Sequence, residues 1–450
     1  MKNVLLLGTG KSANALIDYM LDNAEKEGWM LTLCDISLEQ AKEKSRNSKF
    51  AIPTAFDVSS EEQREELISK SDLVISMLPA SFHSIVAEDC IRLKKSLITP
   101  SYVSEEMKAL DQKAKDAGVL LLNEIGLDPG IDHMSAMKII ESVKSNGGKL
   151  TAFESFTGGL IAPESDNNPW HYKFTWAPRN VILAGQGQGG VKFLHNGRYK
   201  YIPYHRLFER TEIIEIPGYG KFEGYANRDS LKYQKLYDLE DVQTMYRGTF
   251  RRPKYCKAWN ILVQIGMTDD SYIMEHTEDM TYRQFTNTFL KFREYDSVEL
   301  KLAYYVGIDV DSEEMEMLKW LGLFDHEKIG LKDATPAEVL QHILEKKWAM
   351  EPGDKDMIVM LHLFRYEKDS EIREITSSMV VIGEDDHQTA MAKTVGLPIG
   401  ICAKLVLNGR ITLTGVHIPK VSEVYMPVLA ELKMLGIDFE ENETLIKEAG

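Results

Sequence analysis

The sequence VLLLGTGKSANALIDYM, residues 4–20, decides the fold of this chain. Its apolar run Val4–Leu7 is too short for a helix and predicts a buried strand. The chain then breaks at the glycines of Gly8-Thr9-Gly10 and continues with apolar residues at the spacing of one helix face. A strand that turns on glycines into a helix points several backbone N–H groups at one place, where the helix dipole adds positive potential. Such a place suits a pyrophosphate.

The glycine turn matches the dinucleotide fingerprint G-x-G-x-x-A, whose third small position lets the helix pack closely on the strand. Because tight turns alone can produce this glycine pattern, the prediction depends on the strand before it and the helix after it. Both are present, and we therefore predict that the turn binds a dinucleotide. The residues expected at the cofactor in this turn are Gly8, Thr9, Gly10, Lys11, Ser12 and Ala13.

A second apolar segment, Met30–Leu33, predicts the next strand and leads to Asp35. This acid follows Ala13 at about the 20-residue spacing of the carboxylate that binds the adenosine ribose in such folds. A carboxylate there would repel the 2′-phosphate of NADP, and no arginine follows directly to hold that phosphate. We therefore expect NAD rather than NADP. The alternative role for Asp35 is a helix cap, for which Ser37 competes.

Strand and helix signals continue to alternate up to about residue 125. This alternation predicts an α/β fold with a doubly wound parallel sheet. Ligands of such a sheet bind beyond the carboxyl ends of its strands. The expected helices span about 38–48, 60–70, 83–94 and 104–117, and the expected strands are Leu73–Met77, Ser96–Thr99 and Val119–Leu122.

The carboxyl ends of the expected strands carry side chains suited to ligands. The short segment that ends at Asp57-Val58 could contact an adenine. The strand that ends at Met77-Leu78-Pro79 could form an apolar, proline-stiffened wall for the nicotinamide. Ser101 and Tyr102 then supply hydroxyl groups where a substrate would meet the cofactor. The residues expected at the adenine and the nicotinamide are Asp57, Val58, Met77, Leu78 and Pro79.

The segment NEIGLDPGIDHM, residues 123–134, bends at two glycines and a proline before a helix that begins near Ile131. Asp128 could cap this helix or present a carboxylate to the cleft. His133 could be a structural hydrogen-bond partner or a proton carrier. Asp128, Asp132 and His133 could also suggest a metal site, but no second cluster offers the remaining ligands. We therefore expect no metal.

The pattern changes beyond about residue 150. A strand at Thr151–Phe156 is expected to end in a Thr157-Gly158-Gly159 turn, and aromatic and basic residues interleave through 170–260. Arginines there would suit a substrate with several carboxylates, and pairing with surplus acids is the alternative. Residues 276–345 become helical. Further strands are expected at about 356–366, 371–381 and 411–415, and helices at 388–407, kinked or split at Pro398, and 421–435.

Composition excludes several classes of protein. The net charge of −16 argues against nucleic acid, which usually binds a basic surface. No run approaches the length of a membrane span, and the chain starts directly with a strand, so we expect neither a membrane segment nor a secretory leader. The four cysteines form no close pair, which suits a reducing cytoplasm and small buried side chains. They are Cys34, Cys90, Cys256 and Cys402.

The chain resembles the saccharopine dehydrogenases of the glutamate-forming type, also called saccharopine reductases. The resemblance runs nearly end to end, and its most specific parts are the GLDPGIDH run and the GGL-x-APE run. The motifs that carry it are SYVS at 101–104, GLDPGIDHM at 126–134, ESFTGGLIAPESDNNPWHYKFTWAPRNV from Glu154, NRDS at 227–230, RGT at 247–249, WLGLF at 320–324 and PGDKDMIVM at 352–360.

The resemblance implies three structural parts. They are a Rossmann domain completed by C-terminal segments, a mixed α/β substrate and dimerisation domain, and a helical domain inserted in the latter. Applied to this sequence, the expected parts are 1–125 with about 385–450, about 126–275 with 346–384, and about 276–345.

The implied reaction is the oxidative cleavage of saccharopine to glutamate and 2-aminoadipate 6-semialdehyde, or its reverse, in lysine metabolism. Asp128 would hold or deprotonate the substrate amine, with Tyr102 orienting a carboxylate or water and His133 as a second acid–base candidate. A homodimer and a small-molecule substrate are also implied, with no nucleic acid or membrane as partner. The residues expected at the substrate are Ser101, Tyr102, Asp128, Thr157, Gly158 and Arg228.

The sequence departs from the family pattern at two positions. Thr157 stands where members often carry cysteine, so a thiol cannot be essential here. Fungal members of the synthetic direction use NADP and carry an arginine near the end of the second strand, where this chain has Asp35. This difference favours NAD and the degradative direction. The alternatives are a carboxynorspermidine-type dehydrogenase of polyamine synthesis and a nucleotide-sensing protein without catalysis.

Overall fold

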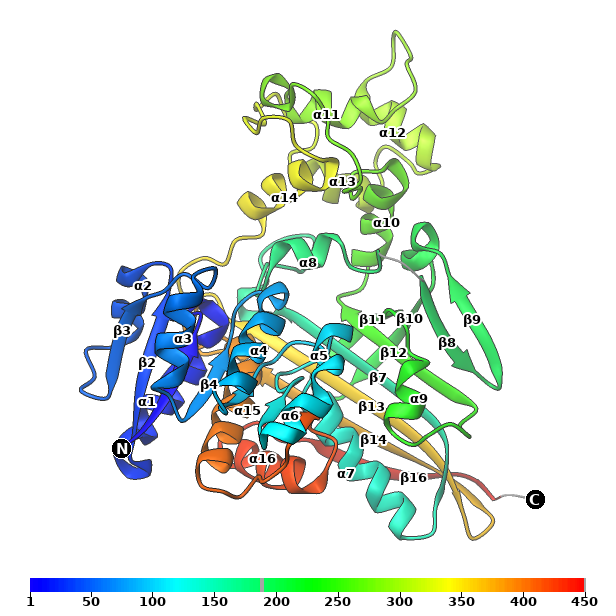
Figure 1. The fold of residues 1–450 in the computed structure, drawn as a ribbon. Helices are drawn as coiled ribbons and strands as arrows, with labels where there is room; N and C mark the ends of the chain where they lie inside the picture. Colours follow the sequence, from blue (N-terminus) through cyan, green and yellow to red (C-terminus); the bar gives the residue numbers. More distant parts are fainter. Residues whose placement is uncertain (187–189, 449–450) are drawn as a thin grey trace. The chain divides into compact units, whose positions relative to one another are not determined.

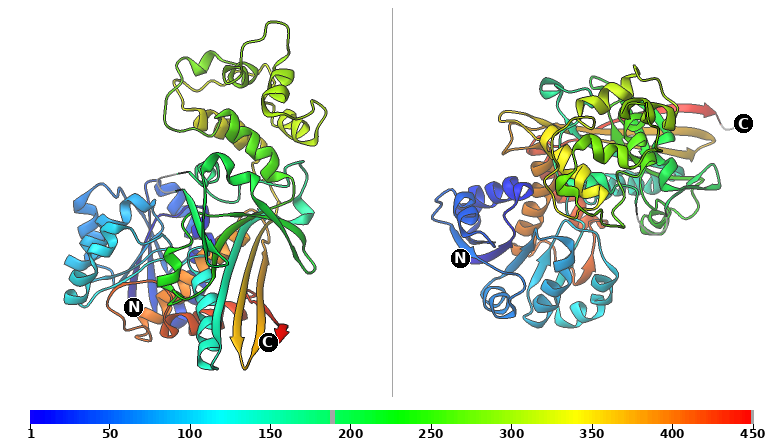
Figure 2. Two further views of the ribbon diagram at one scale, coloured as in Figure 1. Left: turned by 90° about the vertical axis from the view of Figure 1, so that its right-hand side faces the viewer. Right: turned by 90° about the horizontal axis from the view of Figure 1, so that it is seen from above.

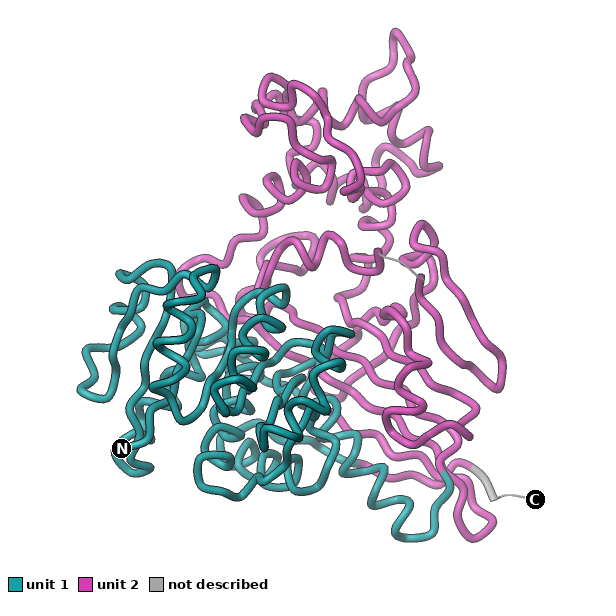
Figure 3. The backbone as a smooth tube through the Cα atoms, viewed as in Figure 1, with its two compact units in different colours: residues 1–149, 379–441 teal, residues 150–378, 442–450 magenta. Residues whose placement is uncertain are grey.

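The computed structural model describes residues 1–186 and 190–448. The chain forms two compact units (Figure 3). Unit 1 consists of Met1–Lys149 and Met379–Glu441, and unit 2 of Leu150–Ser378 and Asn442–Gly450. The first boundary thus lies after residue 149 rather than at the expected 125, and the helical segment 276–345 belongs to unit 2.

Unit 1 is built on a seven-stranded sheet in the order β15-β6-β5-β4-β1-β2-β3. Its strands β2, β3 and β4 are labelled in Figure 1. Every pair of neighbouring strands is parallel. The chain starts in the middle with β1, moves out through β2 and β3, and then places β4, β5 and β6 on the other side. This is the Rossmann order, so the predicted doubly wound α/β sheet is confirmed. The strands are β1 Lys2–Leu7, β2 Trp29–Asp35, β3 Ala51–Ala55, β4 Leu73–Ser76, β5 Ser96–Ile98, β6 Leu120–Leu122 and β15 Gly415–His417.

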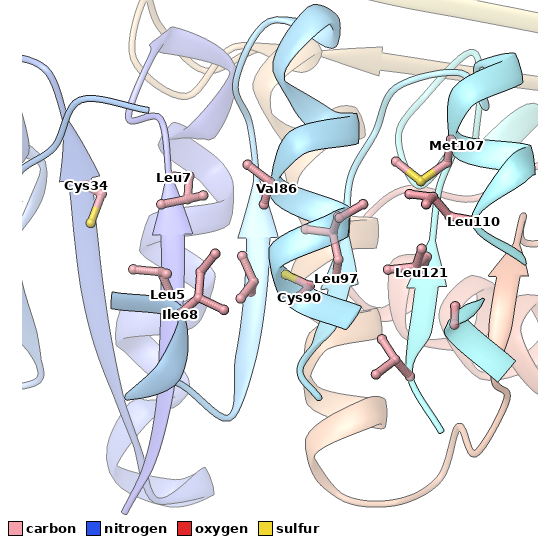
Figure 4. Packing of buried hydrophobic residues seen from close by; sticks show 14 of the residues in the cluster. Leu5, Leu7, Cys34, Ile68, Val86, Cys90, Leu97, Met107, Leu110 and Leu121 are labelled. Atoms are coloured by element: carbon pink, nitrogen blue, oxygen red, sulfur yellow. The ribbon is translucent and has the colours of Figure 1, made fainter. Parts of the chain in front are cut away.

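Helices pack on both faces of this sheet, which explains why its central strands are apolar throughout. On one face, Leu5 and Leu97 of the strands meet Val86 and Cys90 of α4 in a buried cluster (Figure 4). On the other face, α1 packs against α15 and β2. The helices of unit 1 are α1 Asn14–Glu27, α2 Leu38–Lys44, α3 Glu61–Ser69, α4 His83–Arg92, α5 Glu105–Ala109, α6 Asp111–Ala117, α7 Ile131–Ser145, α15 Ala390–Leu407 and α16 Ser422–Met434.

Helix α15 differs from two expectations. It runs as one continuous element through Pro398, so the predicted split is wrong. It is also the one helix in the described part of the chain that is long and apolar enough to cross a membrane, although 72% of it is buried inside the protein. Close packing on α1 accounts for this apolar composition, since a Cβ added at Gly396 would lie 2.7 Å from the Leu16 backbone nitrogen. We interpret α15 as a core helix of unit 1.

Unit 2 contains a nine-stranded sheet whose main path is β10-β11-β12-β7-β13-β14-β16, with β8 paired to β12 and β9. It is mixed, because β12 pairs parallel with β7 and antiparallel with β11. The predicted mixed α/β architecture of this part is therefore confirmed. The strands are β7 Lys149–Ile161, β8 Val191–His195, β9 Arg198–Ile202, β10 Thr211–Ile216, β11 Gly220–Ala226, β12 Thr244–Arg251, β13 Asp356–Lys368, β14 Glu371–Ile382 and β16 Glu440–Glu448.

The remaining helices lie in unit 2, and α11–α14 gather in one group beyond the strands, as Figures 1 and 2 show from different sides. Two details of the C-terminal prediction are wrong. The expected strand 411–415 is shifted to β15, and the chain continues past α16 into β16. The helices are α8 Pro178–Ile182, α9 Lys232–Leu236, α10 Tyr255–Ile265, α11 Tyr282–Thr288, α12 Val298–Val306, α13 Glu313–Trp320 and α14 Pro336–Lys347.

The four cysteines are buried and free, as predicted. Burial raises the pKa of Cys34 to about 12, with a smaller contribution from the neighbouring Asp35 carboxylate. The Cys34 thiol is therefore neutral at physiological pH and acts as a small apolar side chain.

Candidate active site

The glycine turn lies at the middle of the unit 1 sheet, where β1 and β4 end side by side. Gly8 has a φ of +92°, and a Cβ there would lie 3.1 Å from the Met77 backbone oxygen. The turn is anchored because the Gly8 N–H donates to the Cys34 carbonyl at 2.8 Å, and the Met77 N–H donates to the Leu7 carbonyl at 2.8 Å. Glycine is needed at position 8 because both the backbone angle and the neighbouring strand exclude a side chain.

The turn leaves a set of backbone donors for a ligand. Within the described part of the chain, the N–H groups of Gly10, Lys11 and Ser12 have no hydrogen-bond acceptor. A short 3₁₀ turn, Lys11–Ala13, leads from them directly into α1. A Cβ added at Gly10 would meet no heavy atom within 4 Å, so the space in front of these donors is open. Free donors, open space and a helix N-terminus behind them fit a pyrophosphate.

Asp35 ends β2 beside this turn, but its carboxylate serves the protein itself. Oδ2 accepts hydrogen bonds from the Thr9 N–H at 2.9 Å and the Thr9 hydroxyl at 2.8 Å, and Oδ1 accepts from the Ser37 N–H at 3.2 Å. Burial alone would raise the pKa of Asp35, but the hydrogen bonds from Thr9 outweigh it and hold the pKa below its ordinary value. Asp35 thus fixes the glycine turn to the end of β2. Ser37, and not Asp35, caps α2.

The other residues predicted at the cofactor also lie at the carboxyl ends of strands. Met77, Leu78 and Pro79 follow β4, next to Gly8, and Met77 and Leu78 are half-buried. Asp57 and Val58 follow β3 at the edge of the sheet. The structure therefore places Met77 beside the glycine turn. Asp57 and Val58 lie farther from it, beyond β2, the strand that ends in Asp35. Their cofactor contacts stay predictions.

His83 is a site residue that the sequence analysis missed. It opens α4 and is buried, with Nδ1 3.0 Å from the Ser76 hydroxyl and Nε2 2.7 Å from the Ser101 hydroxyl. A third hydroxyl, that of Thr99, lies 3.1 Å from Nε2. Burial lowers the pKa of His83 to about 4, so the ring is neutral near pH 7. The sequence signal was a histidine four positions after Pro79, which is compatible with many buried roles.

Tyr102 and Asp128 meet although 26 residues separate them in the sequence, and the Tyr102 hydroxyl donates to Asp128 Oδ1 at 3.1 Å. Both side chains are half-buried. Asp128 is not the helix cap, because the residue before α7 is Gly130, whose N–H donates to Asp132 Oδ1 at 2.6 Å. The helix-cap alternative for Asp128 is therefore wrong, and its contact with a substrate stays a prediction.

The loop that presents Asp128 is tightly closed. The Ile131 N–H donates to the Gly126 carbonyl at 2.9 Å, and the Asp132 N–H donates to the Leu127 carbonyl at 3.1 Å. Gly130 has a φ of +145°, and a Cβ there would lie 2.1 Å from the Gly126 oxygen. The glycines of the GLDPG run are therefore required for this closure.

His133 faces the interior of unit 1. It is completely buried, and its Nε2 lies 2.7 Å from Oε2 of Glu124, a second residue that the sequence analysis missed. Because the imidazole is directed at a buried carboxylate, the geometry favours a structural contact over the predicted proton transfer to substrate.

Unit 2 holds the remaining predicted substrate residues. Thr157 and Gly158 lie inside β7 rather than in a turn, so the predicted end of this strand is wrong. Gly158 is needed there because a Cβ would lie 2.8 Å from the Phe250 Cβ on β12. The buried Thr157 hydroxyl has no hydrogen-bond partner among the described residues. Arg228 is exposed, with a φ of +47°.

The arginines predicted to bind substrate carboxylates have different surroundings. Arg179 pairs with Asp270, and Arg206 pairs with Glu209 at 3.1 Å, as the salt-bridge alternative expected. Arg251 is buried against tyrosine rings. The predicted contact of Arg228 with a substrate carboxylate stays a prediction.

The parallel sheet, the glycine turn and the polar side chains at its carboxyl edge define a dinucleotide-binding Rossmann protein with an adjacent candidate active site. Comparisons with known proteins identify its family. Residues 4–122 match the model of the saccharopine dehydrogenase NADP binding domain, and residues 126–437 match that of the saccharopine dehydrogenase C-terminal domain. The chain belongs to the saccharopine dehydrogenase family.

Individual relatives agree with this assignment. A saccharopine dehydrogenase [NADP(+), L-glutamate-forming] from Pyricularia oryzae is 35% identical, and the match covers 98% of both chains. The mitochondrial alpha-aminoadipic semialdehyde synthase of Rattus norvegicus is 33% identical over 99% of this chain, which spans 48% of that protein. The solved structure of apo saccharopine dehydrogenase (L-Glu forming) from Saccharomyces cerevisiae superposes with a TM-score of 0.89 at 32% identity, covering 99% of this chain and 100% of that one.

These findings correct the expected cofactor. The matching family model is that of an NADP binding domain, and relatives from Pyricularia oryzae and Schizosaccharomyces pombe carry NADP(+) in their names. The expectation of NAD is therefore wrong. It rested on Asp35 as a ribose-binding carboxylate, whereas the structure shows this carboxylate bonded to Thr9 and Ser37. The degradative direction was inferred from the same residue and loses that support.

Proposed function

We propose that this protein is an NADP-dependent saccharopine dehydrogenase that interconverts saccharopine with glutamate and 2-aminoadipate 6-semialdehyde. The observation that supports it most strongly is the Tyr102–Asp128 pair, which lies at the same edge of the unit 1 sheet as the glycine turn. The family assignment over nearly the whole chain supplies the substrate. A carboxynorspermidine-type activity has no comparable support in the relatives.

The reaction needs a neutral secondary amine, because a protonated nitrogen cannot donate electrons to the imine that forms when hydride leaves the adjacent carbon. NADP⁺, when bound, supplies the hydride acceptor. Water then attacks the imine, and the resulting carbinolamine collapses with proton transfer to the departing glutamate nitrogen. A positioned acid–base group contributes about 10²- to 10⁴-fold to such proton transfers. Orientation of the reacting groups contributes much of the remainder.

In this proposal Asp128 accepts the proton of the substrate amine, and Tyr102 orients Asp128 through the hydrogen bond from its hydroxyl. Ser101 binds a substrate carboxylate or the attacking water, with its hydroxyl oriented by the neutral His83 ring. The N–H groups of Gly10 and Lys11 would hold the pyrophosphate of the cofactor.

The family resemblance assigns further substrate contacts to residues of unit 2. Arg228 binds a carboxylate of the glutamate or aminoadipate part through its guanidinium, which matches a carboxylate with two parallel hydrogen bonds. Thr157 and Gly158 contact the substrate as well, and the buried Thr157 hydroxyl, which has no partner in the described chain, is available for such a contact.

The decisive assay follows the nicotinamide absorbance with saccharopine as substrate and with NADP⁺ and NAD⁺ in parallel. We expect faster turnover with NADP⁺ and glutamate as a product identified by mass spectrometry. Carboxynorspermidine serves as the competing substrate in the same assay. Turnover of that compound alone would replace the proposal with the polyamine alternative, and cofactor binding without any turnover would indicate a sensing protein.

The proposed binding of a substrate carboxylate by Arg228 has its own test. Arg228→Lys retains the charge but not the planar fork, so we expect the KM for saccharopine to rise about 10-fold or more while the KM for NADP⁺ stays unchanged. Arg206→Lys is the matched control, because Arg206 pairs with Glu209. Unchanged saccharopine kinetics in Arg228→Lys would remove Arg228 from the site.

We also infer a homodimer located in the cytoplasm. The dimer is suggested by the family resemblance, and light scattering after size-exclusion chromatography would measure it. A reducing compartment is consistent with four free, buried cysteines. Fractionation of the source cells tests the location, and recovery in an organelle fraction would contradict it.

A further inference from the structure

Glu124 occupies an unusual position between the two side chains proposed for catalysis. It follows β6 with a φ of +58°, a conformation that residues other than glycine rarely adopt. The residue is 7% exposed, so its carboxylate is largely buried. A strained backbone and a buried acid each carry a free-energy cost, and both persist only where surrounding contacts compensate for them.

The contacts of Glu124 hold Tyr102 from both sides. The Glu124 N–H donates to the carbonyl of Ser101, the residue before Tyr102, at 3.1 Å. Glu124 Oε1 accepts from the N–H of Val103, the residue after it, at 3.0 Å. The positive φ of Glu124 lets one residue direct both its backbone N–H and its carboxylate at the same short segment. The backbone of Tyr102 is thereby fixed.

The other oxygen of the same carboxylate reaches the helix that follows Asp128. Glu124 Oε2 lies 2.7 Å from Nε2 of His133, in the first turn of α7, and His133 is completely buried. Helix α7 begins directly after the closed loop that presents Asp128. One carboxylate therefore connects the backbone of Tyr102 to the helix that carries the Asp128 loop.

These contacts close a ring that runs from Tyr102 through Glu124, His133 and the Asp128 loop, and back through the hydrogen bond between the Tyr102 hydroxyl and Asp128. We propose that Glu124 is a positioning residue of the reaction, which holds Tyr102 against Asp128 with His133 as its anchor. This inference rests on the proposed function of the Tyr102–Asp128 pair. It assigns His133 to the positioning of a catalytic pair rather than to proton transfer.

Glu124→Gln is the direct test because it keeps the shape and one acceptor oxygen but removes the charge that faces His133. Misplacement of a reacting group by about 1 Å can cost about 10²-fold, so we expect kcat to fall about 10- to 100-fold. The KM for NADP⁺ should stay within about twofold, since the glycine turn is bonded to β2 and β4 and not to Glu124. Glu105→Gln, at an exposed acid on α5, is the matched control and should leave kcat unchanged.

A double-mutant cycle separates positioning from a general loss of stability. If Glu124 acts through Tyr102, Glu124→Gln should lower kcat by less than about twofold when it is introduced into Tyr102→Phe. A contribution to stability alone would lower the activity equally in both backgrounds, and that additive result would overturn the proposal. His133→Asn repeats the cycle from the anchor side, so the test does not depend on the folding of one variant.

A second measurement does not require turnover. With 3-fluorotyrosine at position 102, the ¹⁹F resonance reports the environment and pKa of that phenol directly. We expect Glu124→Gln to shift or broaden this resonance and Glu105→Gln to leave it unchanged. An unchanged resonance would overturn the positioning role. If the unmodified protein does not turn over saccharopine, the proposed function is wrong. The resonance can be measured without turnover, so this failure is distinguishable from a failure of the positioning role.

Discussion

The two halves of the candidate site in unit 1 present different kinds of chemical groups. The glycine turn presents backbone N–H groups, and the neighbouring carboxylate of Asp35 is bonded to Thr9. The second half presents the side chains of Ser101, Tyr102 and Asp128, each hydrogen-bonded to another side chain. Backbone recognition depends on local geometry, whereas side-chain recognition depends on contacts between distant segments.

This difference predicts which substitutions each half tolerates. The turn should be sensitive to added bulk and insensitive to isosteric changes of side-chain chemistry. The side-chain half should respond strongly even to isosteric changes, because a lost charge or donor breaks a contact that several residues share.

The largest effect is expected for Asp128→Asn. An amide cannot accept the proton of the substrate amine, so kcat should fall about 10²- to 10⁴-fold across the pH range. The KM for NADP⁺ should change little, because the turn is bonded separately. Steady-state kinetics from pH 6 to 10 would measure both parameters. Near-normal kcat at every pH would mean that Asp128 has no chemical role. It would also contradict the expectation that the side-chain half responds strongly to isosteric substitutions.

The next effect concerns stability and pH at His83. Burial depresses its pKa from 6.5 to about 4, so the unfolded chain takes up a proton at a higher pH than the folded protein does. Stability should therefore fall as the pH drops from about 7 towards 4, and the contribution of His83 to this loss should reach on the order of 3 kcal/mol. Urea unfolding at pH 7 and pH 5 tests this, with His83→Gln as the comparison. The same slope in both proteins would contradict a neutral, buried His83.

Gly8→Ala should disrupt the glycine turn, the half of the candidate site that presents backbone N–H groups. An L-residue at a φ of +92°, with its Cβ 3.1 Å from the Met77 oxygen, costs about 1–3 kcal/mol, and we expect the Kd for NADPH to rise about 10-fold. Fluorescence titration measures it. Gly118→Ala is the matched control, since Gly118 has a φ of +68° but open space around it. Gly118→Ala should lower stability without changing the Kd, and equal effects on the Kd would show that close approach at Gly8 is unimportant.

The smallest effect is expected for Asp35→Asn. It weakens the hydrogen bonds to Thr9, and we expect a loss of about 1 kcal/mol in unfolding free energy at pH 7 after allowance for solvent screening. Because the folded pKa of Asp35 lies below its ordinary value, this contribution is present at neutral pH and disappears as the pH falls through the folded pKa. Unfolding curves at pH 7 and pH 3 would measure the difference. A pH-independent difference would exclude the carboxylate charge as its source.

Local sequence patterns predicted most of unit 1 because strand and helix periods and the glycine turn are properties of neighbouring residues. The expected strand Leu73–Met77 corresponds to β4, and the helix expected from Ile131 corresponds to α7. Unit 2 was predicted less completely. Its strand β7 continues through Thr157 and Gly158, and β16 pairs with a strand about 60 residues earlier. Such pairings join distant segments, and no local pattern records them.

The sequence by itself determined the class of fold, the place of the glycine turn and the family, because each of these is encoded in a contiguous run of residues. The tertiary structure decided what individual polar side chains do. It bonded Asp35 to Thr9, placed His83 behind Ser101, and set Glu124 between Tyr102 and His133. These roles arise where parallel strands β4, β5 and β6 end side by side. A carboxylate or imidazole acquires its function from the groups that the fold brings within hydrogen-bond distance.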